Sequence, residues 1–181
     1  QALTTTQVAS LATDKLNALS STKLNALETA DMAALTTNQV ASIATGMVGN
    51  LSTSFVKALT GDQLAAVTTS QFAKLSSTQL QAIETGDVGS LTSSQINQLT
   101  NIKIQALSTV QLQQLSTDVI SGLQLDGSGN LTLSTAQLAN LANEQINALA
   151  TGQISALSST YLRALTPTAL SVLDSTQLQS I

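Results

Sequence analysis

The residues best suited to hold a metal ion form one short DGSGN segment. In it, Asp126, Ser128 and Asn130 have the 1-3-5 spacing of oxygen ligands in calcium-binding loops. Such loops also need glycine at the sixth position and a bidentate glutamate at the twelfth, where Leu131 and Gln137 stand instead. Glycine, asparagine and aspartate are also the residues that turns prefer. The segment therefore indicates a plain turn, with a calcium site as the alternative.

No other group of residues in the sequence indicates chemistry. Histidine and cysteine are absent, which removes the commonest general base and the thiol nucleophile. The acidic residues recur at repeat positions and not in converging pairs. Glu84 and Asp87 share one expected helix start, where capping explains them better than catalysis. Serine and threonine are abundant, but none has an evident activating base. We therefore expect no enzyme, no catalytic residue and no cofactor.

Charge and composition argue against two classes of partner. The net charge is −4, the six Lys and Arg residues are scattered, and aromatic residues make up 2% of the chain. Nucleic-acid binding needs clustered basic residues or aromatic stacking platforms. No apolar run approaches the roughly 20 residues that cross a membrane. We expect neither a nucleic-acid partner nor a membrane span.

The dominant feature is a repeat of eight residues. Leucine, or Ile or Val in its place, recurs every eight residues from Leu3 to Leu115, then from Leu133 to Leu173, and the pattern reaches Ile181. The unit reads Leu, Thr/Ser, Thr/Ser, variable, Gln, Val/Leu/Ile, variable, Ala, and we number these positions 1 to 8. A fixed short period is typical of an array of one small structural unit.

The spacing of the two apolar positions favours very short helices. Positions 1 and 6 are alternately five and three residues apart, so they would point to opposite faces of a strand. In one unbroken helix, eight residues overshoot two turns by about 80°, and the apolar stripe would wind around the rod. With position 2 as the N-cap, position 5 becomes N3 of an S/T-x-x-Q capping box, and positions 1 and 6 form a hydrophobic staple.

Two details support this frame for the helices. The single proline, Pro167, stands at position 3 directly after Thr166, which is the N1 site that tolerates proline best. Acidic residues concentrate near the expected N-termini, where they oppose the positive end of the helix dipole. They are Asp14, Glu28, Asp62, Glu84, Asp118, Glu144 and Asp174. The strand propensity of Thr, Val and Ile keeps a β-solenoid open as the alternative.

Single octads cannot fold alone, because a helix of six or seven residues does not repay its nucleation. We therefore expect an all-α solenoid with one helix per octad and a shared core. The pattern breaks once, where Leu123 and Leu133 are ten residues apart and leucines alternate around the DGSGN segment. This segment predicts a β-hairpin-like loop. The expected layout is a repeat array at 1–122, an insertion at 123–132 and a repeat array at 133–181, in one continuous solenoid.

The octads resemble the Thr/Gln/Ala-rich repeat tracts of very large secreted or surface proteins of Gram-negative bacteria, many of them adhesin-like or matrix-forming. The segments LTTTQVAS (Leu3 to Ser10) and LTTNQVAS (Leu35 to Ser42) carry the resemblance, which extends over nearly the whole chain. IATGMVGN (Ile43 to Asn50) departs from the regular unit. The resemblance implies an extracellular or cell-surface structural role and supplies no catalytic residue.

We therefore expect a structural segment, either a stalk or spacer or the subunit of a self-associating filament. Both ends of the sequence lie inside the octad pattern without an atypical polar cap, so we expect continuation into a longer chain or end-to-end association. The alternative is a binding surface, in which Thr and Ser at positions 2 and 3 form a hydroxyl ladder for ice, a glycan or an adhesion ligand. Use of these hydroxyls as helix caps is favoured over that alternative.

Overall fold

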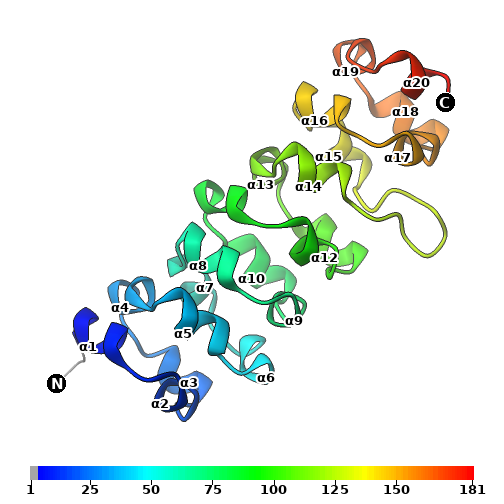
Figure 1. The fold of residues 1–181 in the computed structure, drawn as a ribbon. Coiled ribbons are helices and arrows are strands. Elements are labelled where there is room, and N and C mark those ends of the chain that lie inside the picture. The colour runs from blue at the N-terminus through cyan, green and yellow to red at the C-terminus, as the bar shows by residue number, and fades with distance from the viewer. Residues whose placement is uncertain (1–3) are drawn as a thin grey trace. The chain divides into compact units, whose positions relative to one another are not determined.

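The computed structural model describes residues 4–181, and the ordered elements in that range are short helices (Figure 1). The helices are four to six residues long, and no strand occurs among the described residues. Each regular octad forms one helix. The predicted all-α fold of very short helices is confirmed, and the β-solenoid alternative is wrong.

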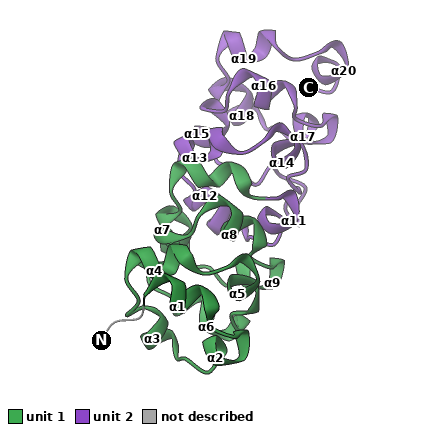
Figure 2. Ribbon diagram, turned by 60° about the vertical axis from the view of Figure 1, so that its left-hand side comes forward, with its two compact units in different colours: residues 1–91 green, residues 92–181 purple. Residues whose placement is uncertain are grey.

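The chain forms two compact units, residues 1–91 and 92–181 (Figure 2), which we describe separately. The first unit contains α1 (Thr5–Ser10), α2 (Thr13–Asn17), α3 (Ser21–Leu24), α4 (Thr29–Ala34), α5 (Thr37–Ser42), α6 (Thr45–Val48), α7 (Thr53–Ala58), α8 (Gly61–Ala66), α9 (Thr69–Phe72), α10 (Ser77–Ala82) and the 3₁₀ helix η1 (Thr85–Ser90). The second unit contains α11 (Ser93–Ile96), α12 (Asn101–Ala106), α13 (Thr109–Gln114), α14 (Thr117–Ser121), α15 (Thr135–Ala139), α16 (Asn143–Asn147), α17 (Thr151–Ser155), α18 (Ser159–Ala164), α19 (Pro167–Ser171) and α20 (Ser175–Leu178). A single continuous solenoid stays a prediction.

Helix α5 shows how one octad fixes its own boundaries. The N-cap Thr36 has an extended backbone, and its hydroxyl accepts a hydrogen bond from the N–H of Gln39. The Gln39 side chain accepts one from the N–H of Thr36 in return, which completes the predicted capping box. The helix ends at Ile43, whose N–H donates to the carbonyl of Val40 at 3.2 Å. Because Ile43 is position 1 of the next octad, each helix ends where the next cap begins.

The other sequence signals for helix starts are confirmed as well. Pro167 is the first residue of α19, directly after the N-cap Thr166. Asp62 and Asp118 lie in the first turns of α8 and α14. Glu84 is the N-cap residue of η1. The caps and the helix dipole, which are local effects, therefore set the element boundaries.

Within each unit, a helix packs against the helix of the octad three further along. In the first unit α1, α4, α7 and α10 pack in succession, and so do α2, α5, α8 and η1. In the second unit, α15 packs on α18, α16 on α19 and α17 on α20. One turn of each solenoid therefore contains three octads, and positions 1 and 6 fill its interior. The sequence did not predict this number.

The insertion at 123–132 replaces one helix with a projecting loop (Figure 1). Two backbone hydrogen bonds, both of 2.8 Å, close the loop. The N–H of Asp126 donates to the carbonyl of Asn130, and the N–H of Gly129 donates to the carbonyl of Asp126. Gly129 has a φ of 78°, a left-handed conformation that favours glycine. The predicted hairpin-like insertion is thus a tight loop, and no strands flank it in the described residues.

Candidate functional site: the seams between turns

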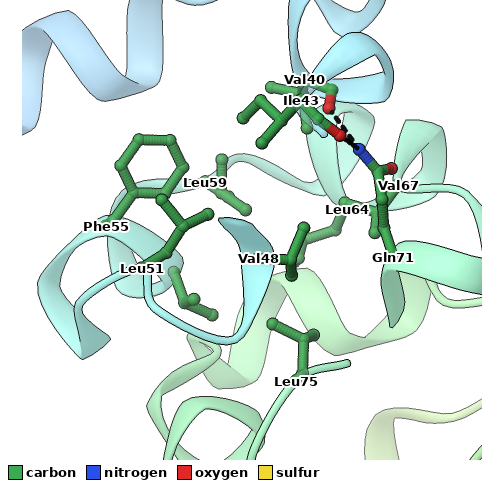
Figure 3. A pocket seen from close by; sticks show the side chains of 11 residues that line it. Val40, Ile43, Val48, Leu51, Phe55, Leu59, Leu64, Val67, Gln71 and Leu75 are labelled. Atoms are coloured by element: carbon green, nitrogen blue, oxygen red, sulfur yellow. Dashed lines mark hydrogen bonds between the residues drawn. The ribbon is translucent and has the colours of Figure 1, made fainter. Parts of the chain in front are cut away.

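The glutamine at position 5 connects one solenoid turn to the turn before it. Figure 3 shows this for Gln71, whose side chain is 2% exposed. Its Oε1 accepts from the N–H of Thr68, the N-cap residue of its own helix, at 2.8 Å. Its Nε2 donates to the carbonyls of Val40 and Ile43, at 3.0 and 2.6 Å. One buried amide therefore caps its own helix and also binds the chain one turn below.

The same arrangement recurs in both units. Glutamine Nε2 atoms donate to main-chain carbonyls of the preceding turn at distances from 2.6 to 3.2 Å. The glutamines are Gln39, Gln63, Gln71, Gln79, Gln137, Gln145, Gln153 and Gln177. Their acceptors lie in the last turn of a helix or at the position-1 residue that follows it, where carbonyls have few or no intrahelical partners. Each glutamine thus satisfies the start of one helix and the end of another. We call these rows of bonds the glutamine seams.

The spacing of the seam bonds shows how the insertion is accommodated. Gln39 and Gln71 reach back 28 and 31 residues, whereas Gln145 and Gln153 reach back 30 and 33. The two extra residues of the insertion lie between the bonded partners in the second case. The loop therefore projects outward without changing which octads stack.

In some octads that lack glutamine at position 5, an asparagine at position 7 of the octad one turn below accepts the hydrogen bond from the N-cap N–H instead. The octad of α6 has Met47 at position 5, so its N-cap residue Ala44 receives no glutamine bond from its own helix. Instead the N–H of Ala44 donates to Oδ1 of Asn17 at 2.9 Å, and Nδ2 of Asn17 donates to the carbonyl of Ser42 at 2.7 Å. A side chain from the turn below therefore supplies the missing acceptor.

Two further octads use the same substitution. Asn25 accepts from the N–H of Ser52, where Phe55 replaces glutamine, and Asn97 accepts from the N–H of Gln124 in the insertion. For Asn17 and Asn25, the asparagine stands 30 residues before the position 5 that lacks glutamine. The eight-residue pattern by itself does not indicate this pairing. The offset of 30 residues is a partial signal for this pairing in the sequence, since Asn147 stands 30 residues before Gln177 as well.

The interior of the first unit contains a small apolar cavity of about 20 Å³ (Figure 3). Its lining comes mostly from positions 1 and 6, including Ile43, Leu51 and Leu64. Three consecutive octads carry valine at position 6, namely Val40, Val48 and Val56. Since valine is one methylene shorter than the leucine at position 6 of other octads, such as Leu64, this turn is slightly underpacked. Apolar cavities of this kind stay dry, and no polar surface faces into this one.

The candidate calcium ligands lie together in the loop as a turn centred on Asp126. Its Oδ1 accepts from the N–H groups of Ser128 and Asn130, each at 2.9 Å, and Nδ2 of Asn101 donates to its Oδ2 at 3.3 Å. The N–H of Asn130 and then that of Ser128 donate to the Asp126 carboxylate and lower its pKa from the ordinary value of an aspartate. Among residues 4–181 no three His, Cys, Asp or Glu side chains gather where they could hold a metal. Calcium binding stays a prediction of the spacing alone.

The other acidic pair singled out from the sequence lies at the start of η1, as expected from capping. Glu84 is its N-cap residue and Asp87 lies in its first turn. Oε1 of Glu84 is 3.3 Å from Nζ of Lys57, and both side chains are more than half exposed. Lys57 occupies position 7 one turn below Glu84, as Asn17 does below Ala44. The ion pair of Lys57 and Glu84 is therefore one of the contacts between turns.

These features define an all-helical solenoid repeat protein whose turns are joined by buried side-chain amides. A family model described as the ALTTAQ repeat matches residues 8–45, which is 38 of the 181 residues. The match supports a repeat family for that segment. No curated protein matches the chain. Within residues 4–181, no helix has the length and apolar character needed to cross a membrane.

Proposed function

We propose that this chain is a structural repeat segment of an extracellular or cell-surface protein, acting as a stalk or spacer or as a self-associating filament subunit. The glutamine seams are the observation that carries the proposal. The most buried polar side chains of the repeat are spent on joining one turn to the next. The proposal assigns no catalysis to the chain.

The energetics of the octad favour a structural role. A helix of four to six residues has too few hydrogen bonds to persist alone. Each octad therefore depends on the octad three octads before it and on the octad three octads after it, as in other solenoids. Because contacts of the same kind recur from turn to turn, length can be added without a new core. That property suits a spacer, whose job is to hold two other parts at a distance.

The extracellular placement is supported by the resemblance of the octads to repeat tracts of secreted and surface proteins. Antibody labelling of intact cells that express the full-length protein tests it. We expect labelling without permeabilisation. Signal that appears only after the cells are permeabilised would contradict the placement.

Insertion of whole turns tests the spacer role. One or two copies of residues 59–82, which make one complete turn, are inserted after Ala82. Small-angle X-ray scattering should show the longest dimension of the chain growing by the same increment with each copy. Unchanged far-ultraviolet circular dichroism per residue is the control for folding. A longest dimension that stays constant as turns are added would overturn the spacer role.

A further inference from the structure

We propose that the Asp126-Gly127 pair is a modification site, at which the aspartate converts spontaneously to isoaspartate, and that Asn101 slows this conversion. The inference goes beyond the proposed structural function and does not depend on it. It concerns the loop inserted within the array, which has helical octads both before and after it.

The sequence singles out one pair of residues for this chemistry. Only one glycine in the chain directly follows an aspartate or an asparagine, and the pair is Asp126-Gly127. Glycine has no Cβ, so its backbone nitrogen approaches the preceding side chain with the least steric hindrance. Every other aspartate lies in a short helix or caps one, where helical hydrogen bonds hold the following backbone. Residue type and backbone freedom therefore both point to the loop.

The loop leaves the attacking nitrogen free and open to water. Gly127 is exposed, and among residues 4–181 its N–H donates to no hydrogen-bond acceptor. Apart from its chain neighbours, no atom lies within 4 Å of the place where a Cβ on Gly127 would stand. The nitrogen and the carboxyl carbon of Asp126 belong to adjacent residues, so the chain itself holds the two reacting atoms close together.

The reaction forms a five-membered imide and then opens it. The nitrogen of Gly127 bonds to Cγ of Asp126, and one carboxylate oxygen leaves as water with the amide proton and one proton from the solvent. Water then adds to one of the two imide carbonyls. Cleavage of the bond between the nitrogen and the former main-chain carbonyl gives isoaspartate, whereas cleavage of the bond to Cγ restores aspartate. Water is the only co-reactant.

Hydrogen bonds to the Asp126 carboxylate oppose the first step, because the leaving oxygen must give them up. Within the loop, Oδ1 accepts from the N–H groups of Ser128 and Asn130 at 2.9 Å each. Nδ2 of Asn130 lies 3.3 and 3.4 Å from the two carboxylate oxygens. From outside the loop, Nδ2 of Asn101 donates to Oδ2 at 3.3 Å. Asn101 is the first residue of α12, one turn below the loop, so the array restrains the carboxylate as well.

Conversion opens the loop but leaves the stacked turns in place. In isoaspartate the chain passes through Cγ, and the former main-chain carbonyl becomes a free carboxylate. That carbonyl is the acceptor for the N–H of Gly129, so one of the two bonds that close the loop is disrupted. The seams of Gln137 and Gln153 connect turns around the insertion without using residues 126–130. The change is therefore confined to the loop.

Peptide mapping of the folded 181-residue chain after incubation at neutral pH tests the site. Digestion uses a protease that cleaves before aspartate, since isoaspartate resists this cleavage. We expect resistance to grow with time at Asp126 and not at the other aspartates. G127A should slow the conversion at least about tenfold, because the added Cβ hinders the attack, while the open space around it leaves the loop intact. An unchanged rate in G127A, or equal conversion at another aspartate, would overturn the proposal.

Substitution of Asn101 tests the restraint. N101A removes the donor from the turn below, and we expect the conversion to become about three to ten times faster. N143A is the matched control, since Asn143 is the exposed first residue of α16, and it should convert at the rate of the parent chain. In urea the N101A chain and the parent should convert at equal rates, because the restraint requires the fold.

Two outcomes would show that Asn101 does not restrain the carboxylate. One is an N101A chain that converts no faster than N143A, and the other is an N101A chain that remains faster in urea. Circular dichroism of each variant verifies that the helices are formed before rates are compared.

Discussion

At the scale of single residues, two glutamines that both occupy position 5 make different contacts, one buried and one exposed. Gln71 satisfies an N–H of its own octad and two carbonyls of the turn below. Within residues 4–181, the side chain of Gln7 bonds to the N-cap residue of its own helix, Thr4. The residue type is the same in both octads, so the additional bonds of Gln71 come from the carbonyls that the neighbouring turn places beside it.

Replacement of Gln71 by alanine should therefore cost far more than replacement of Gln7. Q71A removes the side-chain bonds to the N–H of Thr68 and to the carbonyls of Val40 and Ile43, of which the Val40 carbonyl keeps the N–H of Ile43 as a donor. We expect the free energy of unfolding to fall by about 2–4 kcal/mol. Q7A should cost about 1 kcal/mol or less, because its site is exposed to water. Denaturant titration followed by circular dichroism measures both. Equal losses would show that the inter-turn bonds add nothing.

The pairing of Asn17 with the octad of Met47 predicts a compensating substitution. N17A removes the acceptor for the N–H of Ala44, and we expect a loss of about 1–2 kcal/mol. M47Q in the same chain places a consensus glutamine at position 5, where it can accept that N–H and reach the turn below. The double variant should regain most of the lost stability. No coupling between the two substitutions in a double-mutant cycle would contradict the pairing.

At the scale of elements, the sequence predicted the helices well because their boundaries are set by nearby residues. The N-cap at position 2, the glutamine at N3 and Pro167 at N1 all act within one octad. The number of octads per turn was not predictable in this way. Because each octad has the same pattern of residues, the sequence period does not distinguish stacking on the third octad along the chain from stacking on the fourth. Only irregular octads, such as those of Met47 and Phe55, break that degeneracy.

The loop at the insertion predicts a dependence on pH. The backbone N–H groups of Asn130 and Ser128 hold the pKa of Asp126 below the ordinary value of an aspartate. The ionised carboxylate therefore stabilises the loop fully above the ordinary pKa, and this stabilisation is lost as pH falls through the lowered pKa. We expect faster exchange of the Ser128 and Asn130 amides, relative to helical amides, as Asp126 is protonated. D126N should abolish this pH dependence in a nuclear magnetic resonance measurement.

The apolar cavity predicts that one valine can be enlarged with a gain in stability. V48L adds a methylene beside the cavity, and we expect the free energy of unfolding to rise by about 0.5–1 kcal/mol. V8L enlarges a fully buried valine that does not line the cavity, so overpacking should lower stability by about 1 kcal/mol or more. Thermal denaturation compares the two. A loss of stability in V48L would show that the cavity cannot accept the added group.

At the scale of the whole molecule, the octads share one sequence pattern, but individual octads fit the particular octads one turn above or below them. Gly61, for example, lies against Ser90 of the octad one turn above, and a Cβ at Gly61 would collide with that side chain. A comparable fit is found wherever an asparagine serves an octad that lacks glutamine. Octads are therefore interchangeable in their own helix formation but not in their position in the stack.

This specificity predicts different outcomes for two insertions after Ala82. A copy of residues 59–82 keeps a glycine below Ser90, and stability should not fall. A copy of residues 75–82 alone places the octad that starts at Ile83 above the octad of Thr69, whose side chain would meet Ser90. We expect a lower denaturation midpoint for the shorter insertion, and T69G in that chain should recover part of it. Equal midpoints would show that vertical fit does not matter.

The burial of the seam amides also affects how readily these glutamines are deamidated. Hydrolysis of a glutamine side chain to glutamate would exchange both N–H donors for oxygen lone pairs that face carbonyl oxygens. Glutamine and asparagine are among the residues that limit the lifetime of proteins at high temperature. The seam glutamines are 2–4% exposed, and little water reaches them. The burial that makes these amides structurally costly to lose therefore also shields them from chemical decay.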